Sequence, residues 1–429
     1  MKPLPHFISD NVNLLRRHTG ILENFFSMTL VSFLNSAFSL ILYPLLIRRL
    51  GADSYGLFVF AFSFVNYFLA LVAFGFDMVG ARHVAIADGK KDLQLKEEVL
   101  TAILTIKSII AIGATLLYFI IILCVPFLRT HIALYTALAF LIPINVLSTA
   151  WYFQAIQKNR VNLIIQLLSK VLLLIGVVLW VQQESDTAVY ATCVSGTTLL
   201  AMVGALVYIL RKEHLSLRWV SRATLRNYTR QATPLFFSNM VNTVKIMGMN
   251  NVIGIVLGMS ELAAFDLAYK IMTTANIAIR SLNAAIFPNL VQNFSMMRAK
   301  KVLRKELALG FVAMIALMLC SKWIILLIAG EALVPIAQPI LIILSLLLMI
   351  WMITGFLIDL VLIPTGRYRV VFINQLVSLT SLIVLGFAAV SIHRSAASVA
   401  LALVAAGIAE LAFLMLQIFF KRKQYNLPK

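Results

Sequence analysis

The chain has 429 residues, of which 61% are hydrophobic and 12% charged, and its formal net charge is +19. This composition excludes an ordinary soluble globular protein, and apolar segments of about 20 residues have the length that crosses a bilayer. Basic loops explain the positive charge of a membrane protein, so we expect no nucleic-acid partner. The three cysteines have no metal-ligand spacing, and we expect neither a metal nor a cofactor.

The chain contains twelve apolar segments of membrane-spanning length. We expect each to be a helix, because lipid offers no partner for free backbone groups. They cover residues 23–47, 55–80, 99–124, 132–153, 161–181, 188–210, 231–257, 262–288, 306–329, 336–363, 370–390 and 396–420. The first is too long for the apolar core of a cleaved signal peptide. The expected fold class is an all-α integral membrane protein.

The basic residues divide unevenly between the two sides of these spans. Of the 36 Lys and Arg residues, 26 lie on the side of the N-terminus, 5 on the opposite side and 5 within the spans. The positive-inside rule therefore predicts that both termini are cytoplasmic.

The longest connection, residues 211–230, separates the sixth span from the seventh. Arginines recur there at every fourth residue from Arg218 onward, with apolar residues between them. This pattern predicts a basic amphipathic helix on the cytoplasmic surface. We expect an N-terminal lobe over 1–212, this amphipathic linker over 213–230 and a C-terminal lobe over 231–429.

The two halves repeat each other in sequence. Gly51 after the first span matches Gly258 after the seventh, an offset of 207, and residues 160–169 match 369–378 at an offset of 209. Because six spans is an even number, both halves have the same orientation. We expect two pseudo-symmetric six-helix lobes related by an axis along the membrane normal, a plan that transporters use.

Charged side chains inside spans mark candidate sites, because each costs about 2.5–3.5 kcal/mol to insert against lipid. Asp266, Lys270 and Arg280 share one face of the eighth span. An internal ion pair between Asp266 and Lys270, four residues apart, is the alternative to a role in transport. Lys245 and Asn242 lie on one stripe of the seventh span.

Other embedded groups leave two interpretations open. Lys170 either lines a cavity or bonds another helix, and Glu410 is either a proton or cation site or a structural hydrogen bond. Lys107 lies near a cytoplasmic end, where it either snorkels to the interface or stays embedded. Together the embedded residues predict a mainly cationic cavity between the lobes, which suits phosphate. The substrate-binding candidates are Lys245, Lys270, Arg280, Lys170, Asn242 and Asn35. The ion-coupling candidates are Asp266, Asp77 and Glu410.

A motif around the first two spans resembles the polysaccharide-repeat-unit flippases, the Wzx-type exporters of the multidrug/oligosaccharidyl-lipid/polysaccharide (MOP) superfamily. It runs Tyr43-Pro-Leu-Leu-Ile-Arg-Arg-Leu-Gly-Ala-Asp-Ser-Tyr-Gly-Leu-Phe and continues through Phe74-Gly75-Phe76-Asp77 and Gly80-Ala81-Arg82. The matched positions are Arg48, Gly51, Gly56, Gly75 and Arg82. We expect the glycines to serve close helix packing and the arginines to anchor at the interface.

The resemblance implies a V-shaped pair of lobes that alternates access across a bacterial inner membrane. It implies a substrate of undecaprenyl-pyrophosphate carrying one O-antigen or capsule oligosaccharide, with membrane lipids, a polysaccharide polymerase and a chain-length regulator as partners. The chain has no P-loop and no hydrolase motif, so we expect a transporter driven by an ion gradient, not an enzyme. The alternatives are a drug or cation antiporter of the same superfamily and a polysaccharide polymerase, which would need a large external loop.

Overall fold

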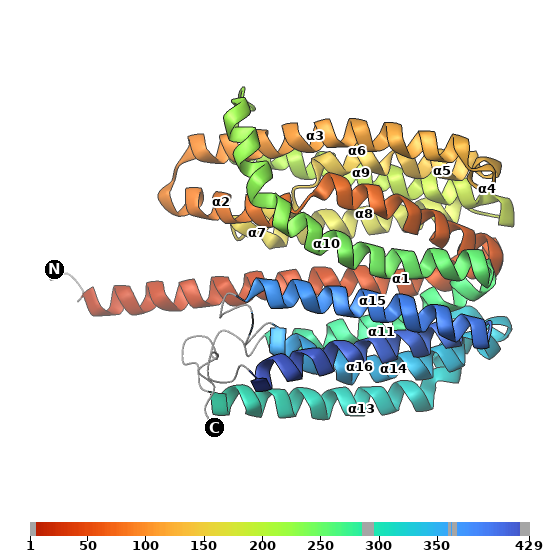
Figure 1. The fold of residues 1–429 in the computed structure, drawn as a ribbon. Coiled ribbons are helices and arrows are strands. Elements are labelled where there is room, and N and C mark those ends of the chain that lie inside the picture. Colours follow the sequence, from red (N-terminus) through yellow and green to blue (C-terminus); the bar gives the residue numbers. More distant parts are fainter. Residues whose placement is uncertain (1–5, 285–295, 359–361, 363–366, 421–429) are drawn as a thin grey trace.

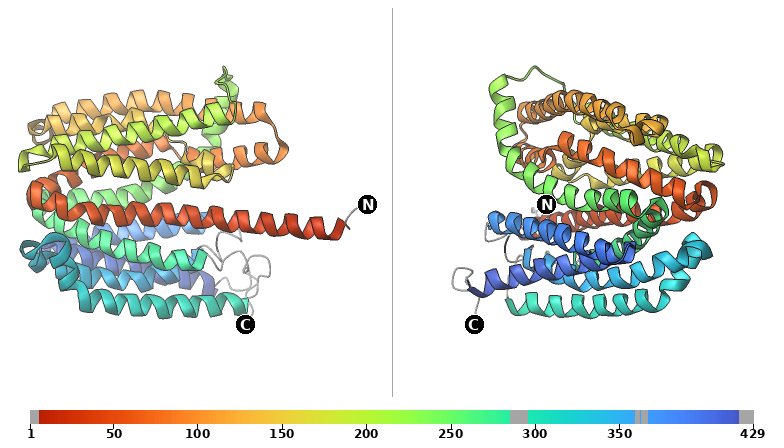
Figure 2. Two further views of the ribbon diagram at one scale, coloured as in Figure 1. Left: turned by 180° about the vertical axis from the view of Figure 1, so that it is seen from behind. Right: turned by 45° about the vertical axis from the view of Figure 1, so that its right-hand side comes forward.

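The structure is a computed structural model, and it describes most of the chain. It covers residues 6–284, 296–358, 362 and 367–420, without the side chains of 6–29, 31, 280–284, 296–302, 368 and 419. Every regular element within these residues is a helix. The helices form two bundles stacked side by side, and α1 and α10 lie along the boundary (Figures 1 and 2). The predicted fold class is therefore confirmed.

The helical elements of the described residues fall into two groups along the chain, eleven before residue 213 and seven after residue 221. The first comprises α1 (His6–Ala73), α2 (Phe76–Lys90), α3 (Leu93–Cys124), α4 (Pro126–Thr130), α5 (Ile132–Ala139), α6 (Leu141–Ile144), η1 (Asn145–Leu147), α7 (Ala150–Ala155), α8 (Asn159–Trp180), η2 (Glu184–Asp186) and α9 (Thr187–Lys212). The second comprises α10 (Arg222–Val256), α11 (Met259–Ala284), α13 (Met296–Ala329), η3 (Glu331–Leu333), α14 (Val334–Leu357), α15 (Tyr368–Ile392) and α16 (Ala396–Phe420).

Nine helical stretches among the described residues are long and apolar enough to cross a membrane. One of them, Ser32–Lys90, contains both arms of α1 and so makes two crossings. Neither α10 nor α11 is among the nine, because each carries many polar side chains, but both lie alongside the other helices (Figure 1). With both counted, the predicted number of twelve spans agrees with the fold.

The first two predicted spans, 23–47 and 55–80, are not separate helices. They join in α1, which kinks at Gly51, where φ is 73° and ψ is 168°. The second predicted span is interrupted at Gly75, which has a φ of 78° and stands just before α2. Positive φ is open to glycine because it has no Cβ, and Gly258 takes a φ of 108° at the matching turn between α10 and α11.

The sequence repeat corresponds to a structural one. The Ser260 hydroxyl donates a hydrogen bond of 2.8 Å to the Asp53 carboxylate, and these residues lie 207 positions apart. Equivalent residues of two related halves meet only near the axis that relates them. The helices α8 and α15 also begin at matching positions, Asn159 and Tyr368. The axis therefore passes between the kink of α1 and the start of α11.

The predicted fourth span, residues 132–153, is broken into α5, α6, η1 and α7. Helix α5 ends at Ala139, four residues before Pro143. A proline has no N–H to donate to the carbonyl four residues earlier, and its ring crowds that carbonyl. Pro143 thus accounts for the end of α5, and the predicted span is divided into short pieces.

The amphipathic helix predicted between the lobes is not a separate element. Helix α9 ends at Lys212 and α10 begins at Arg222, with Ser221 capping the new helix. The segment between them is held by the buried Glu97 of α3, which accepts a 2.8 Å hydrogen bond from the Ser216 backbone N–H. This hydrogen bond to a side chain satisfies a backbone N–H without a helix, so the segment need not be helical.

A second carboxylate ties the end of α9 to the loop before α8. The Glu213 carboxylate accepts from Lys158 at 2.5 Å and lies 3.7 Å from Lys96. This hydrogen bond raises the pKa of the Lys158 ammonium above its ordinary value, although burial opposes the shift.

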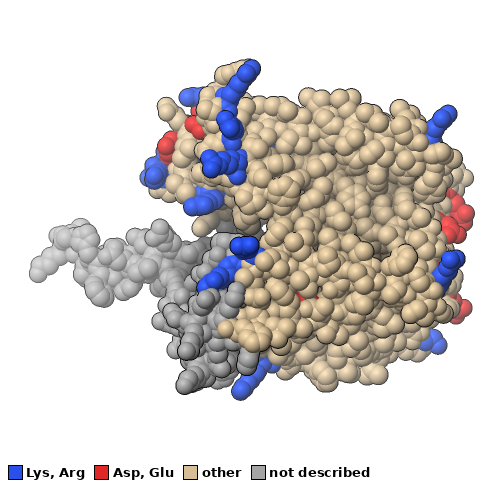
Figure 3. All heavy atoms as spheres, in the orientation of Figure 1, with Lys and Arg blue, Asp and Glu red and all other residues tan. Residues whose placement is uncertain are grey.

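Basic side chains gather at one end of the molecule. Figure 3 shows most of the Lys and Arg on the visible face at the end where α2 meets α3 and α10 begins. We call this the inner end, and we call the opposite end, with the Gly51 kink and the start of α11, the outer end. The embedded charges lie between these two ends.

Candidate substrate-transport site

The lobes are joined near the outer end by a three-residue polar cluster of Tyr55, Asp266 and Lys270. The Lys270 ammonium lies 2.6 Å from the Asp266 carboxylate. The Tyr55 hydroxyl donates to that carboxylate at 2.9 Å and accepts from Lys270 at 2.7 Å. The ion pair left open by the sequence is therefore formed, and Tyr55 of α1 links it to the opposite lobe.

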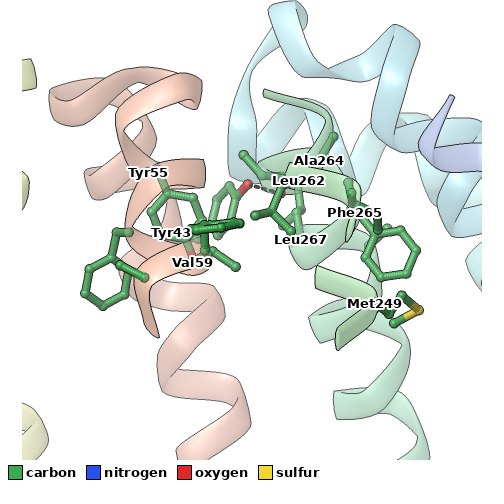
Figure 4. Close-up of a cluster of buried hydrophobic side chains, with 14 of the residues drawn as sticks. Tyr43, Tyr55, Val59, Met249, Leu262, Ala264, Phe265 and Leu267 are labelled. Atoms are coloured by element: carbon green, nitrogen blue, oxygen red, sulfur yellow. Dashed lines mark hydrogen bonds between the residues drawn. The ribbon is translucent and has the colours of Figure 1, made fainter. Parts of the chain in front are cut away.

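Further contacts between α1 and α11 surround this cluster. Tyr43 is fully buried, and its hydroxyl donates to the backbone carbonyl of Ala263 at 2.8 Å. Figure 4 shows Tyr43 pointing from α1 toward α11, beside Leu262 and Leu267. A Cβ on Gly56 would overlap the Met259 carbonyl. Only glycine permits so close an approach, so the lobes are in close contact at the outer end.

A second embedded cation, Lys170 of α8, faces α1. Its ammonium lies 5.7 Å from the centre of the Phe38 ring, a cation–π distance. Lys170 also lines a pocket of about 80 Å³ with Asn35 and Gln166, and it lies within electrostatic reach of Lys270. Lys170 makes no ion pair among the described residues. It is thus a charge of the membrane interior without a bonded anion there.

The third cation, Lys245 of α10, faces α15. Its ammonium lies 3.5 Å from Gln375 Oε1 and 3.3 Å from Ser378 Oγ. These distances are long for hydrogen bonds to nitrogen, so the ammonium retains donor capacity. Gln375 and Ser378 match Gln166 and Ser169 of the first half in the sequence repeat, so the seam α10–α15 corresponds to the seam α1–α8.

Glu410 of α16 is buried, and its carboxylate interacts electrostatically with the Lys245 ammonium. The Asn374 side chain donates to its carboxylate at 2.9 Å. The carbonyl oxygen of the Asn374 side chain is itself buried, with no hydrogen-bond partner among the described residues. The structural hydrogen bond expected of Glu410 is therefore present. Its role as a proton or cation site stays a prediction.

The embedded residues near the inner end are also paired. Lys107 is fully buried, and its ammonium lies 3.0 Å from the Asp77 carboxylate. The Lys107 ammonium is therefore held against α2 inside the protein, and its depth relative to the membrane interface stays a prediction. The Asp77 side chain is 53% exposed, so it remains open to a further partner.

The residues of the family motif have architectural positions. Arg48 and Arg82 are exposed, whereas Arg49 donates to three carbonyls at the C-terminal end of α8, the nearest 2.7 Å away at Val181. A Cβ on Gly75 would press on Leu235 of α10. These contacts accord with the packing role expected of the glycines.

The predicted site residues thus fall into separate groups along the boundary and its seams. Asn35 lies with Lys170, Asp266 with Lys270, and Lys245 near Glu410. Asn242 is exposed on α10, and the side chain of Arg280 lies outside the described residues. Sequence reasoning missed the central position of Tyr55, although this residue stands inside the family motif.

This architecture defines a class: an integral membrane protein with the two-lobed MOP-superfamily fold. A MATE multidrug transporter in an inward-facing conformation matches with a TM-score of 0.67 at 14% identity, covering 92% of this chain and 94% of its own. The lipid II flippase MurJ, in an inward closed conformation, matches with a TM-score of 0.68 at 17% identity, covering 91% and 87%. At these identities the likeness shows the fold alone.

The family is shown by sequence. Residues 21–294 match the family described as "Polysaccharide biosynthesis protein", and the chain belongs to it. A relative from Escherichia coli (strain K12), described as "Putative O-antigen transporter", is 21% identical over 298 residues, which cover 68% of this chain and 70% of the relative. The chain is therefore a multi-pass membrane protein of this family, similar in sequence to that relative and in fold to MOP-superfamily transporters.

Proposed function

We propose that the chain flips undecaprenyl-pyrophosphate-linked polysaccharide repeat units, of O-antigen or capsule, from the cytoplasmic to the periplasmic leaflet. The observation that carries this proposal is Lys170, an embedded lysine without an acidic partner among the described residues, near Lys270 and beside Asn35. A cation in a membrane interior is stabilised by an anion, and pyrophosphate supplies one with several acceptor oxygens. The family and the E. coli relative support a polysaccharide cargo.

The lobes over 1–212 and 231–429 would move about the residues between them. In this scheme the Tyr55 cluster and the Gly56 contact close the outer end while the substrate enters from the inner end. Loss of these contacts would then open the route to the periplasm. Glu410 is the favoured coupling residue, because a carboxylate buried inside a membrane span is costly without a cation beside it. Asp266 and Asp77 remain further candidates.

A drug or cation antiporter is the second candidate, since MATE transporters share the fold. An antiporter for cations needs exposed acid in its cavity. Lys170 and Lys245 instead place positive charge in both seams, so an anionic substrate is favoured. A polymerase is disfavoured by the shortness of the predicted external loops, and the proposed partners remain a polymerase and a chain-length regulator acting after export.

Reporter fusions should place both termini in the cytoplasm of the inner membrane. Fusions after Leu50, Arg129 and Glu331 should report periplasm, because the positive-inside rule puts the sparse charges there. Matched fusions after Lys91 and Lys212 should report cytoplasm. Reversed signals at two or more sites would contradict both the orientation and the proposed direction of transport.

Lys170→Ala and Lys245→Ala should each abolish surface polysaccharide in a deletion strain while the protein still reaches the membrane. Either change removes a cation that the phosphate would meet, a loss of about tenfold or more in affinity. Lys158→Ala is the matched control, because Lys158 is 46% exposed and outside the spans. Arg280→Ala tests the remaining predicted cation. Full complementation by both Lys170→Ala and Lys245→Ala would refute phosphate binding here.

A further inference from the structure

A groove of about 540 Å³ runs between α10 and α15. It extends from Lys245 to Val256 on α10 and from Leu379 to Ser391 on α15, with Arg394 in the connection that follows α15. Eleven helical steps give it a length of about 17 Å, close to half the thickness of a bilayer core of about 30 Å. The groove thus occupies the outer half of the membrane-spanning region.

The walls of this groove are almost entirely apolar, and the groove is open along one side, where some lining residues are exposed. Val252 is 51% exposed and Phe387 is 78% exposed. Gly386 also lines the groove, and a Cβ added to it would meet nothing within 4 Å. Apolar surface of this kind in a membrane protein accepts a hydrocarbon chain, because lipid surrounds it.

The two ends of the groove are cationic. Arg394 is exposed at the outer end, and Lys245 lies in the middle of α10 at the other. A resident phospholipid keeps its phosphate at the membrane surface, where Arg394 can meet it. Such a lipid leaves Lys245 with only the long contacts to Gln375 and Ser378. A lipid that is crossing the membrane brings its phosphate to mid-depth, where Lys245 lies.

We propose that this groove holds the hydrocarbon chain of the lipid-linked substrate while its phosphate contacts Lys245. The inference rests on the proposed function and adds the position of the lipid chain. The chain lies against Val252 and Phe387 and leaves the protein through the open side of the groove. Arg394 then receives the phosphate at the outer surface, so the two cations mark successive positions of one head group.

Photolabelling tests this placement. The full-length protein in nanodiscs of phosphatidylethanolamine and phosphatidylglycerol is irradiated with a polyprenyl pyrophosphate that carries a diazirine in its chain. The expected labels lie on peptides containing Val252 and Phe387, and unreactive polyprenyl pyrophosphate competes them away. Gly386→Phe fills the groove and should lower this labelling by about tenfold. Gly113→Phe on α3 is the matched control, since that exposed glycine also has open space at its Cβ.

Three outcomes overturn the proposal. Equal labelling of the groove by a phosphatidylglycerol probe with the same diazirine, resistant to competition by polyprenyl pyrophosphate, would show that the groove holds ordinary membrane lipid. Unchanged labelling in both Gly386→Phe and the smaller Gly386→Leu also refutes it. Competed labelling elsewhere, with normal export by Gly386→Phe, refutes the groove but leaves the proposed function standing. That function fails separately if a deletion strain keeps its surface polysaccharide.

Discussion

Replacing Lys270 with alanine should destabilise the protein by about 3–5 kcal/mol and abolish export, as expected when one partner of a buried ion pair is removed. The Asp266 side chain is only 12% exposed, and its remaining described bond comes from Tyr55. An isolated carboxylate in this position has lost its compensating charge. A lowered unfolding temperature of the purified protein and loss of surface polysaccharide are the two measurements.

A neutral double variant separates stability from transport. Asp266→Asn with Lys270→Met removes both charges, so it should recover most of the lost stability. If Asp266 carries the coupling ion, the double variant is folded but inactive. A folded double variant that exports normally would eliminate Asp266 as a coupling residue. Lys158→Ala serves as the exposed ion-pair control, with an expected change within about 1 kcal/mol.

Adding a single methyl group at Gly56 should have the second large effect. The new Cβ in Gly56→Ala would collide with the Met259 carbonyl at the contact between α1 and α11. Overpacking of this kind costs about 1–3 kcal/mol, and a backbone carbonyl cannot turn away as a flexible side chain can. We expect the outer end to remain open and export to stop.

The control for this change has the opposite sign. Gly89 lies in the last turn of α2 with open space at its Cβ, so Gly89→Ala should stabilise by about 0.5–1 kcal/mol. Opening is measured by maleimide labelling of Ser260→Cys from outside, in a background without Cys124 and Cys320. Gly56→Ala should increase this labelling. Equal labelling and equal export in the two glycine variants would show that the outer contact has no role in gating.

The sequence by itself determined the architecture. Hydrophobic runs, the bias of basic residues and the repeat offset of 207 predicted twelve spans in two lobes. These signals are local or periodic, because each helix must satisfy its own backbone in lipid. Gly51 and Gly258, which the sequence repeat aligns, both take positive φ at matching turns.

The pairing of the embedded charges was only partly predictable. Spacing along one helix indicated the bond between Asp266 and Lys270, since four residues make one turn. No spacing rule links Tyr55 to that pair, because these residues meet across the lobe boundary. Lys107 likewise reaches Asp77 on another helix, which a single-helix view interprets as an interfacial lysine.

What the sequence determined is therefore which segments are apolar and helical, and in which half of the chain they lie. What only the tertiary structure decided is which of their residues face one another. Periodicity fixes the face of a helix, but the rotation of each helix against its neighbours depends on packing summed over many side chains. The seam between α10 and α15, with Lys245 at mid-depth and Arg394 outside, results from that packing.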